Sequence, residues 1–151
     1  MIKPIKIATI LPYKENYTFS KAQAAAIWVC DFFKYSKFKD NNFIYGNTKS
    51  KDYLTKNYIN IDINNLKSKF TSSTKEYCNN FIKKNENEIF DIIEIHNRPL
   101  VFNYLKNQIN SKFILYFHND PLSMNGSKTS SERLNLLINL DKIIFVSRWV
   151  Q

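Results

Sequence analysis

Six short apolar runs, separated by segments with helical periodicity, constrain the fold of this chain more than any other feature. The runs are IKIATIL (5–11), NFIYG (42–46), YINIDI (58–63), FDIIEIH (90–96), KFILYFH (112–118) and KIIFVS (142–147). We interpret them as strands that are apolar on both faces, which is typical of a parallel sheet covered on both sides. Strands that alternate with helices predict one doubly wound α/β domain over residues 1–151.

The segments between the runs predict four helices. Apolar residues recur at i, i+3 and i+4 after Ser20, which we expect to be the N-cap of the first helix. A polar helix is expected over 73–84, and Pro99 suits the first turn of a third helix over 99–109. The capping box of Thr129 and Glu132 opens a fourth helix, which carries Leu134, Leu137 and Ile138.

Two of the strand-like runs end with the same motif. IIEIHNRP (92–99) and ILYFHNDP (114–121) both continue into His-Asn-x-Pro, and they hold the only two histidines of the chain. Neighbouring parallel strands lie about 4.8 Å apart and end at the same edge, where open α/β sheets bind ligands. We therefore expect one polar rim there, formed by His96, Asn97, Arg98, His118, Asn119 and Asp120. A plainer alternative is that Asn and Pro only turn the chain, but it does not account for the two histidines.

Several chemistries are compatible with such a rim to different degrees. His96, His118 and Asp120 could bind a metal, but they lack the tight spacing of known sites, and we expect no metal. A serine hydrolase needs G-x-S-x-G, which is absent, and phosphate-binding loops need several glycines, whereas the chain has two. A site for a hydroxyl-rich or phosphorylated ligand remains, because His, Asn and Asp bind hydroxyls and Arg98 binds phosphate or carboxylate as a fork.

Composition narrows the possible partners. The formal net charge is +9, but the lysines are scattered and no nucleic-acid-binding motif is present, so we expect no nucleic acid. No apolar run approaches the roughly 18 residues that span a membrane, and no signal peptide is evident. Cys30 and Cys78 fit no metal or disulfide spacing. We expect a cytoplasmic protein with reduced cysteines, with peripheral contact to the inner face of a membrane as an option.

The order of these motifs resembles the N-terminal domain of family 4 glycosyltransferases, which are retaining enzymes of the GT-B fold. The resemblance covers nearly the whole chain and is carried by LPYKENYTFSKAQAAAIWVCDFF, DIIEIHNRP, ILYFHNDPLSMNGSKTSSERL and DKIIFVSRWV. It implies a Rossmann-like domain on the acceptor side, and a C-terminal donor-binding domain that this chain does not include. It also implies a nucleotide-sugar donor, an acceptor that is a sugar or lipid-linked, and no further cofactor.

The resemblance also implies roles for individual residues. His118 matches the family histidine that contacts the donor sugar near the reacting centre, and we take it as the catalytic candidate. Where the family has small glycines near the donor phosphate, this chain has Ala24, Ala25 and Ala26, although a helix N-terminus there would still favour an anion. Further substrate contacts are expected from Tyr13, Glu15, Ser147 and Arg148. The alternatives are a non-catalytic, single-domain binding module and a GT-B epimerase.

Overall fold

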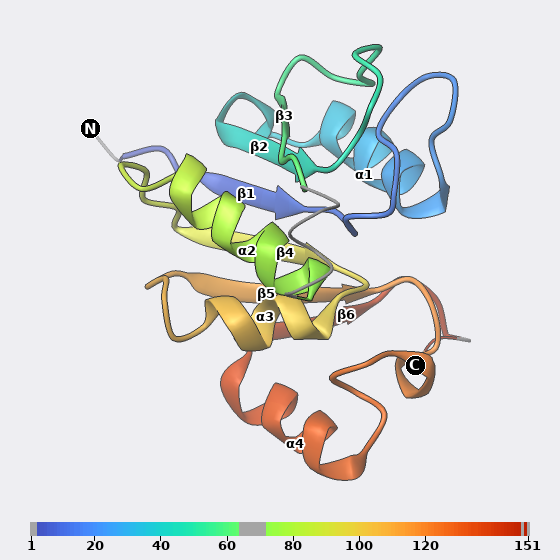
Figure 1. Ribbon diagram of the computed structural model, residues 1–151, viewed down its shortest axis with the longest axis vertical. Helices are drawn as coiled ribbons and strands as arrows, with labels where there is room; N and C mark the ends of the chain where they lie inside the picture. The colour runs from blue at the N-terminus through green and yellow to red at the C-terminus, as the bar shows by residue number, and fades with distance from the viewer. Residues whose placement is uncertain (1–2, 64–71, 149, 151) are drawn as a thin grey trace.

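A six-stranded, all-parallel sheet forms the centre of the molecule (Figure 1). The structure is a computed structural model that describes residues 3–63, 72–148 and 150. The strand order is β3-β2-β1-β4-β5-β6. The strands are β1 (Ile7–Ile10), β2 (Asn42–Gly46), β3 (Tyr58–Asn60), β4 (Ile92–His96), β5 (Lys112–Phe117) and β6 (Lys142–Phe145). The predicted doubly wound, Rossmann-like α/β fold is therefore confirmed.

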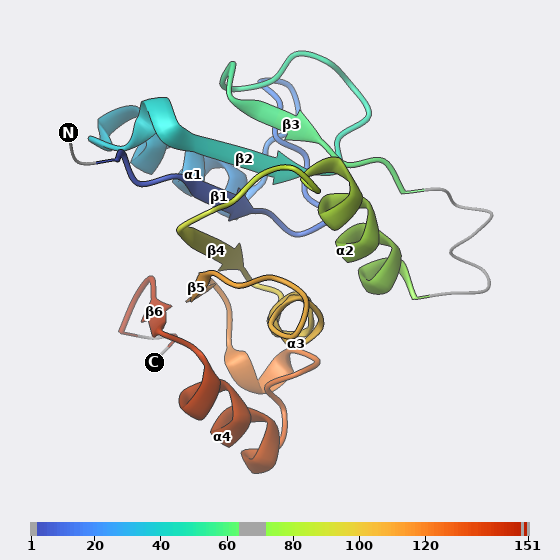
Figure 2. The same cartoon turned by 90° about the vertical axis from the view of Figure 1, so that its left-hand side faces the viewer.

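Helices cover the two faces of the sheet unequally. The helices are α1 (Ala24–Tyr35), α2 (Ser73–Lys84), α3 (Pro99–Leu105) and α4 (Ser130–Asn139), with short 3₁₀ turns η1 (Lys39–Asn41) and η3 (Pro121–Ser123). Within the described residues, α1 lies on one face, and α2, α3 and α4 lie on the other (Figure 2). Right-handed crossovers require this arrangement. The chain moves across the sheet in one direction from β1 to β2, and in the opposite direction from β3 to β4, from β4 to β5 and from β5 to β6.

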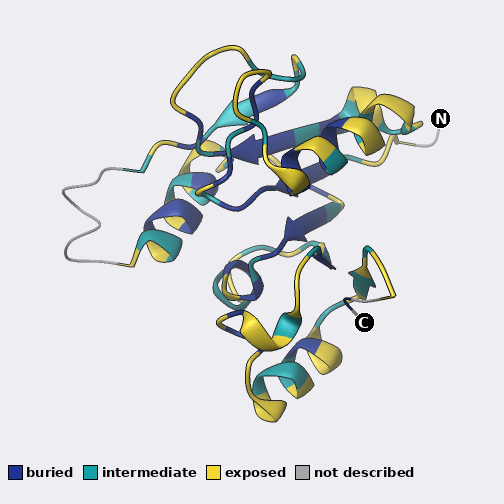
Figure 3. Cartoon of the chain, turned by 90° about the vertical axis from the view of Figure 1, so that its right-hand side faces the viewer, coloured by how far each residue is buried: buried dark blue, intermediate teal, exposed yellow. Residues whose placement is uncertain are grey.

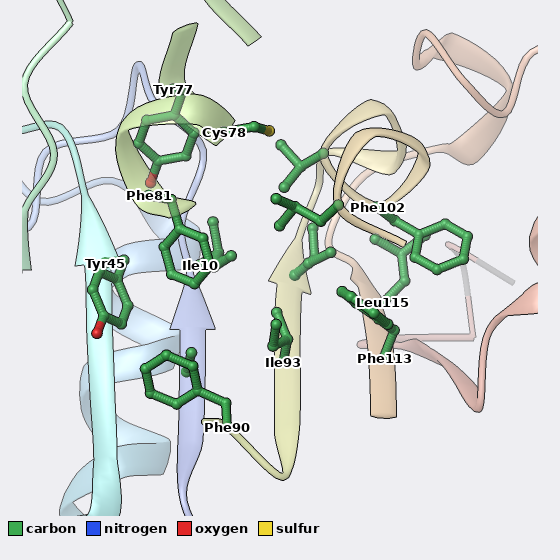
Figure 4. Packing of buried hydrophobic residues seen from close by; sticks show 14 of the residues in the cluster. Ile10, Tyr45, Tyr77, Cys78, Phe81, Phe90, Ile93, Phe102, Phe113 and Leu115 are labelled. Atoms are coloured by element: carbon green, nitrogen blue, oxygen red, sulfur yellow. The ribbon is translucent and has the colours of Figure 1, made fainter. Parts of the chain in front are cut away.

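Two clusters of buried side chains fasten these helices to the sheet. The larger cluster joins α2 and α3 to strands β1, β4 and β5, with Phe81, Phe102 and Ile93 among its members (Figure 4). The smaller cluster packs Val29 of α1 against Ile44 of β2. Successive side chains of a strand point to opposite faces of the sheet. Once one residue of a strand lies in a cluster, the face on which its neighbours in that strand lie is therefore known.

Several sequence-based boundaries are confirmed and others are wrong. The helix over 73–84 has the predicted bounds, and the capping box of Thr129 and Glu132 is formed. The first helix begins at Ala24 rather than just after Ser20, because Ser20 instead bonds through its N–H and hydroxyl to Asp52. The third helix ends at Leu105 rather than at residue 109.

Exposure also departs from the predicted apolar faces. Leu134, Leu137 and Ile138 all lie on the exposed side of α4, whose only buried residue is Leu136 (Figure 3). On α1, Phe32 is half-exposed and Tyr35 almost fully exposed. Cys30 and Cys78 are both buried and free of disulfides.

A matched pair of isoleucines tests the packing of the sheet. Ile93 is 0% exposed in the middle of β4, whereas Ile89 is 72% exposed just before that strand. We expect Ile93→Ala to lower the free energy of unfolding by about 2–5 kcal/mol, because it leaves a cavity in a close-packed core. Ile89→Ala should change it by less than about 0.5 kcal/mol. Equal urea midpoints for the two variants would contradict this packing.

Candidate functional site

The two histidines meet at the carboxyl-end edge of neighbouring strands. β4 and β5 pair in parallel, with His96 opposite Tyr116, and His118 directly follows the last residue of β5. His96 Nδ1 lies 2.8 Å from His118 Nε2, so the two rings share a hydrogen bond. The repeated His-Asn-x-Pro motif therefore brings its histidines together as predicted.

Aromatic side chains enclose the histidine pair on the α1 side of the sheet. His96 is 1% exposed and stacks on Tyr116, with ring centroids 4.6 Å apart. Trp28 of α1 covers both imidazoles, with its ring centroid 5.8 Å from His96 and 5.3 Å from His118. This burial lowers the pKa of His118 to about 4, and burial, aided by the charge of His118, holds the pKa of His96 well below its ordinary value. Both rings are therefore neutral near neutral pH.

The hydrogen bond between the rings determines which nitrogen can meet a ligand. Because His118 Nε2 is committed to His96, Nδ1 is the ring nitrogen of His118 left for another partner. If His118 donates in the pair, its Nδ1 is a bare acceptor; if His96 donates, His118 Nδ1 carries the proton. The Nε2 atom of His96 is buried and has no partner among the described residues. His96 thus orients His118 rather than facing a ligand itself.

Asn97 fastens the ends of the two strands to each other. Its backbone N–H donates to the carbonyl of Tyr116, and its side-chain Oδ1 accepts from the backbone N–H groups of His118 (2.8 Å) and Asn119 (3.3 Å). The φ of Asn97 is 53°, which makes it the only non-glycine residue with positive φ in the described part of the chain. Asn tolerates this left-handed conformation better than most residues do. The turn that carries His118 is therefore set by a side chain of the neighbouring strand.

A polar pocket of about 410 Å³ lies beside Asn97. Three of the residues expected at the rim line it, namely Asn97, Arg98 and Asn119, and so does Tyr13, which was expected among the further substrate contacts. The two histidines are not among its lining residues, because they point to the α1 side of the sheet. The single rim expected from the sequence is therefore divided into a histidine pair under Trp28 and a separate pocket.

The other predicted contacts lie elsewhere. Asp120 caps η3 by accepting from the N–H of Leu122, and it lines a different pocket, between α4 and β6. Ser147 and Arg148 are exposed after β6 and are not among the residues that line the polar pocket. Their position at the carboxyl-end edge agrees with the prediction.

The sequence suggested that Glu15 contacts substrate, but its side chain is bonded to the start of α1 instead. Glu15 is 7% exposed, and its Oε1 accepts from the backbone N–H of Ala26 at 2.8 Å. Burial raises its pKa, against the lowering effect of the N–H groups of Ala26 and Ala25 and of the Arg98 charge. The N-terminus of α1 therefore already holds a carboxyl group of the same chain, where we expected it to favour an external anion.

A second polar group, missed from the sequence, lies under α1 in the middle of the sheet. Glu94 is 9% exposed; its Oε2 is bonded to the hydroxyl of Thr9 and its Oε1 to that of Tyr116. Burial raises the pKa of Glu94. Glu94 lines a groove of about 640 Å³ together with Trp28. The strands are thus not free of polar residues on both faces; Glu94 precedes His96 by two positions in the same strand, and this spacing could have placed the two on one face.

The described residues offer no metal-binding cluster and no membrane span. Among residues 3–63, 72–148 and 150, nowhere do three His, Cys, Asp or Glu side chains gather closely enough to hold a metal ion. None of the helices in that part of the chain has both the length and the apolar character needed to cross a bilayer.

No protein-family model matches the chain, and no match was found among the curated proteins or the solved structures.

The depressed histidine pKa values predict a loss of stability in mild acid. An unfolded histidine has a pKa of about 6.5, above the folded value for both rings, so the unfolded chain binds more protons below that pH. This contribution to stability is complete above about pH 6.5 and is lost as the pH falls toward 4. Urea midpoints should therefore fall between about pH 7 and pH 5, and His118→Gln should lose less over the same interval. An equal loss in both proteins would contradict the assignment.

Variants of Asn97 separate its conformation from its hydrogen bonds. Asn97→Ala removes the acceptor and leaves a Cβ at φ 53°, so we expect it to cost about 1–3 kcal/mol of unfolding free energy. Asn97→Gly loses the same hydrogen bonds without the conformational strain and should cost less. Equilibrium unfolding in urea measures both, and an Ala variant as stable as the Gly variant would exclude strain at this position.

Proposed function

We propose that this chain is the N-terminal, acceptor-side part of a retaining glycosyltransferase of the GT-B fold. The enzyme would move a sugar from a nucleotide-sugar donor to an acceptor hydroxyl in polysaccharide or glycolipid synthesis. The observation that carries the proposal is the neutral, hydrogen-bonded pair of His96 and His118 at the carboxyl-end edge of β4 and β5. Ligands of open α/β sheets bind outside this edge.

The state of His118 suits sugar transfer. In the transition state the bond from the sugar C1 to the departing phosphate oxygen breaks, and positive charge develops on the ring. A neutral imidazole can accept from or donate to a sugar hydroxyl through Nδ1 without placing a cation beside that charge. The acceptor oxygen then bonds to C1, its proton goes to the departing diphosphate, and a nucleoside diphosphate leaves. His118 positions and stabilises in this scheme and need not act as a base.

The contact between Glu15 and α1 supports the division of labour between two domains. Since the first N–H groups of α1 are engaged by Glu15, this domain is poorly suited to hold the donor diphosphate at that helix. We therefore assign the diphosphate to a second Rossmann-like domain, which would face this one. We therefore expect such a domain in the same polypeptide.

Replacement of His118 tests the proposal in the full-length protein. Release of nucleoside diphosphate from a panel of nucleotide sugars is measured for the natural protein and for His118→Ala. If Nδ1 contacts the reacting sugar, turnover should fall by roughly ten- to a thousand-fold while the urea midpoint changes little.

A control variant is Ile89→Ala, an exposed residue just before β4, at the other end of the strand from the histidines and the polar pocket. It should leave turnover close to that of the natural protein. Near-normal turnover in a well-folded His118→Ala protein would refute the catalytic assignment, and absence of turnover with every nucleotide sugar would refute the proposed activity.

A further inference from the structure

The pocket beside the histidine pair has an unusual charge. It lies among the segments that follow β1, β4 and β5, and Thr74 in the first turn of α2 also lines it. Arg98 and Lys128 contribute two positive charges, and none of its described lining residues is Asp or Glu. Side-chain amides of Asn97 and Asn119, which can donate hydrogen bonds, complete the wall beside these cations. Such a lining fits an anion that carries two negative charges.

Arg98 is held in place but has most of its donors free. Its guanidinium lies over the ring of Tyr13, 5.7 Å from the centroid, and Nη1 donates to the carbonyl of Asn97 at 3.0 Å. No ion pair of Arg98 occurs within the described residues. Glu15 is near enough for Arg98 to lower its pKa, but its Oε1 is bonded to α1. Because guanidinium has five N–H donors, four remain for a ligand.

The loop that carries Lys128 is fixed by contacts on both sides. Ser127 is fully buried and donates its hydroxyl to the carbonyl of Pro121, and Arg133 donates to the carbonyl of Lys128. Gly126 has a φ of +91°, and a Cβ there would lie 3.1 Å from the backbone nitrogen of Leu100. The two loops that supply the cations are therefore packed together.

We propose that this pocket binds a phosphate group of the acceptor. This inference rests on the proposed function and adds a substrate class to it: a phosphomonoester, whether on a soluble sugar phosphate or on a lipid-linked one. Arg98 would hold two phosphate oxygens as a fork, and Lys128 would balance the remaining charge. Asn97 lines the pocket and also fixes the backbone of His118, so one residue joins the pocket to the histidine pair.

Direct binding of inorganic phosphate tests the pocket without any assumption about turnover. Chemical shifts of the full-length protein are followed by NMR as phosphate is added at constant ionic strength. We expect saturable changes at the pocket, with the dissociation constant raised roughly ten- to a hundred-fold by Arg98→Gln and roughly three-fold by Lys128→Gln. Lys142→Gln removes the same charge at the start of β6, at the opposite edge of the sheet, and should leave binding unchanged. Binding that is absent, or equally affected by all three variants, would overturn the proposal.

A second pair of probes distinguishes the two sources of phosphate. The dissociation constant for a soluble sugar 1-phosphate is compared with binding to phosphatidylcholine vesicles with and without a polyprenyl phosphate. If Arg98→Gln loses binding to the sugar 1-phosphate, the site takes a soluble phosphate; if it loses binding to the polyprenyl phosphate vesicles, the site takes a lipid-linked one. The outcome is independent of catalysis: phosphate binding without sugar transfer would refute the proposed function alone, whereas transfer without phosphate binding would refute only this inference.

Discussion

The pairing of β1 with both β2 and β4 determines where everything else in this molecule lies. β1 is short and wholly buried, and the chain leaves it in one direction and later returns to its other side. Because the crossovers are right-handed, that reversal sends α1 to one face and the later helices to the other. The loops that follow β1 and β4 also leave toward opposite faces of the sheet, and such a reversal of strand order opens a crevice at the carboxyl ends of the strands. The histidine pair, Asn97 and the polar pocket all lie along that edge.

Much of the fold could be predicted because its signals are local. The strand runs, the helix over 73–84 and the capping box at Thr129 each depend on residues within one or two turns. The start of α1 could not be predicted in this way. Ser20 looks like an N-cap, but its hydroxyl bonds to Asp52, which comes from a loop more than thirty positions away. The N–H that a cap would satisfy, that of Ala26, instead meets Glu15. Neither the bond from Ser20 to Asp52 nor that from Ala26 to Glu15 can be recognised from the residues next to them in the sequence.

The candidate site shows the same division between local and distant information. Convergence of His96 and His118 followed from two equal motifs one strand–helix–strand unit apart. The separation of the histidines from Asn97 and Asn119 follows from the alternation of side chains along a strand, since successive residues face opposite sides. That alternation was available in the sequence, and Glu94 two positions before His96 marked the same face. The left-handed conformation of Asn97 was not available, because Asn is also common in ordinary turns.

Glu15 makes the N-terminus of α1 a site with its own tethered competitor. A carboxyl group that is part of the chain meets the N–H of Ala26 at a fixed effective concentration, on the order of millimolar or higher for a short link. Free phosphates and nucleotides in solution would have to exceed that value before they displaced it. The helix end can thus lie close to the proposed phosphate pocket and still discriminate against free anions. Selectivity here comes from an intramolecular ligand that diffusion cannot remove.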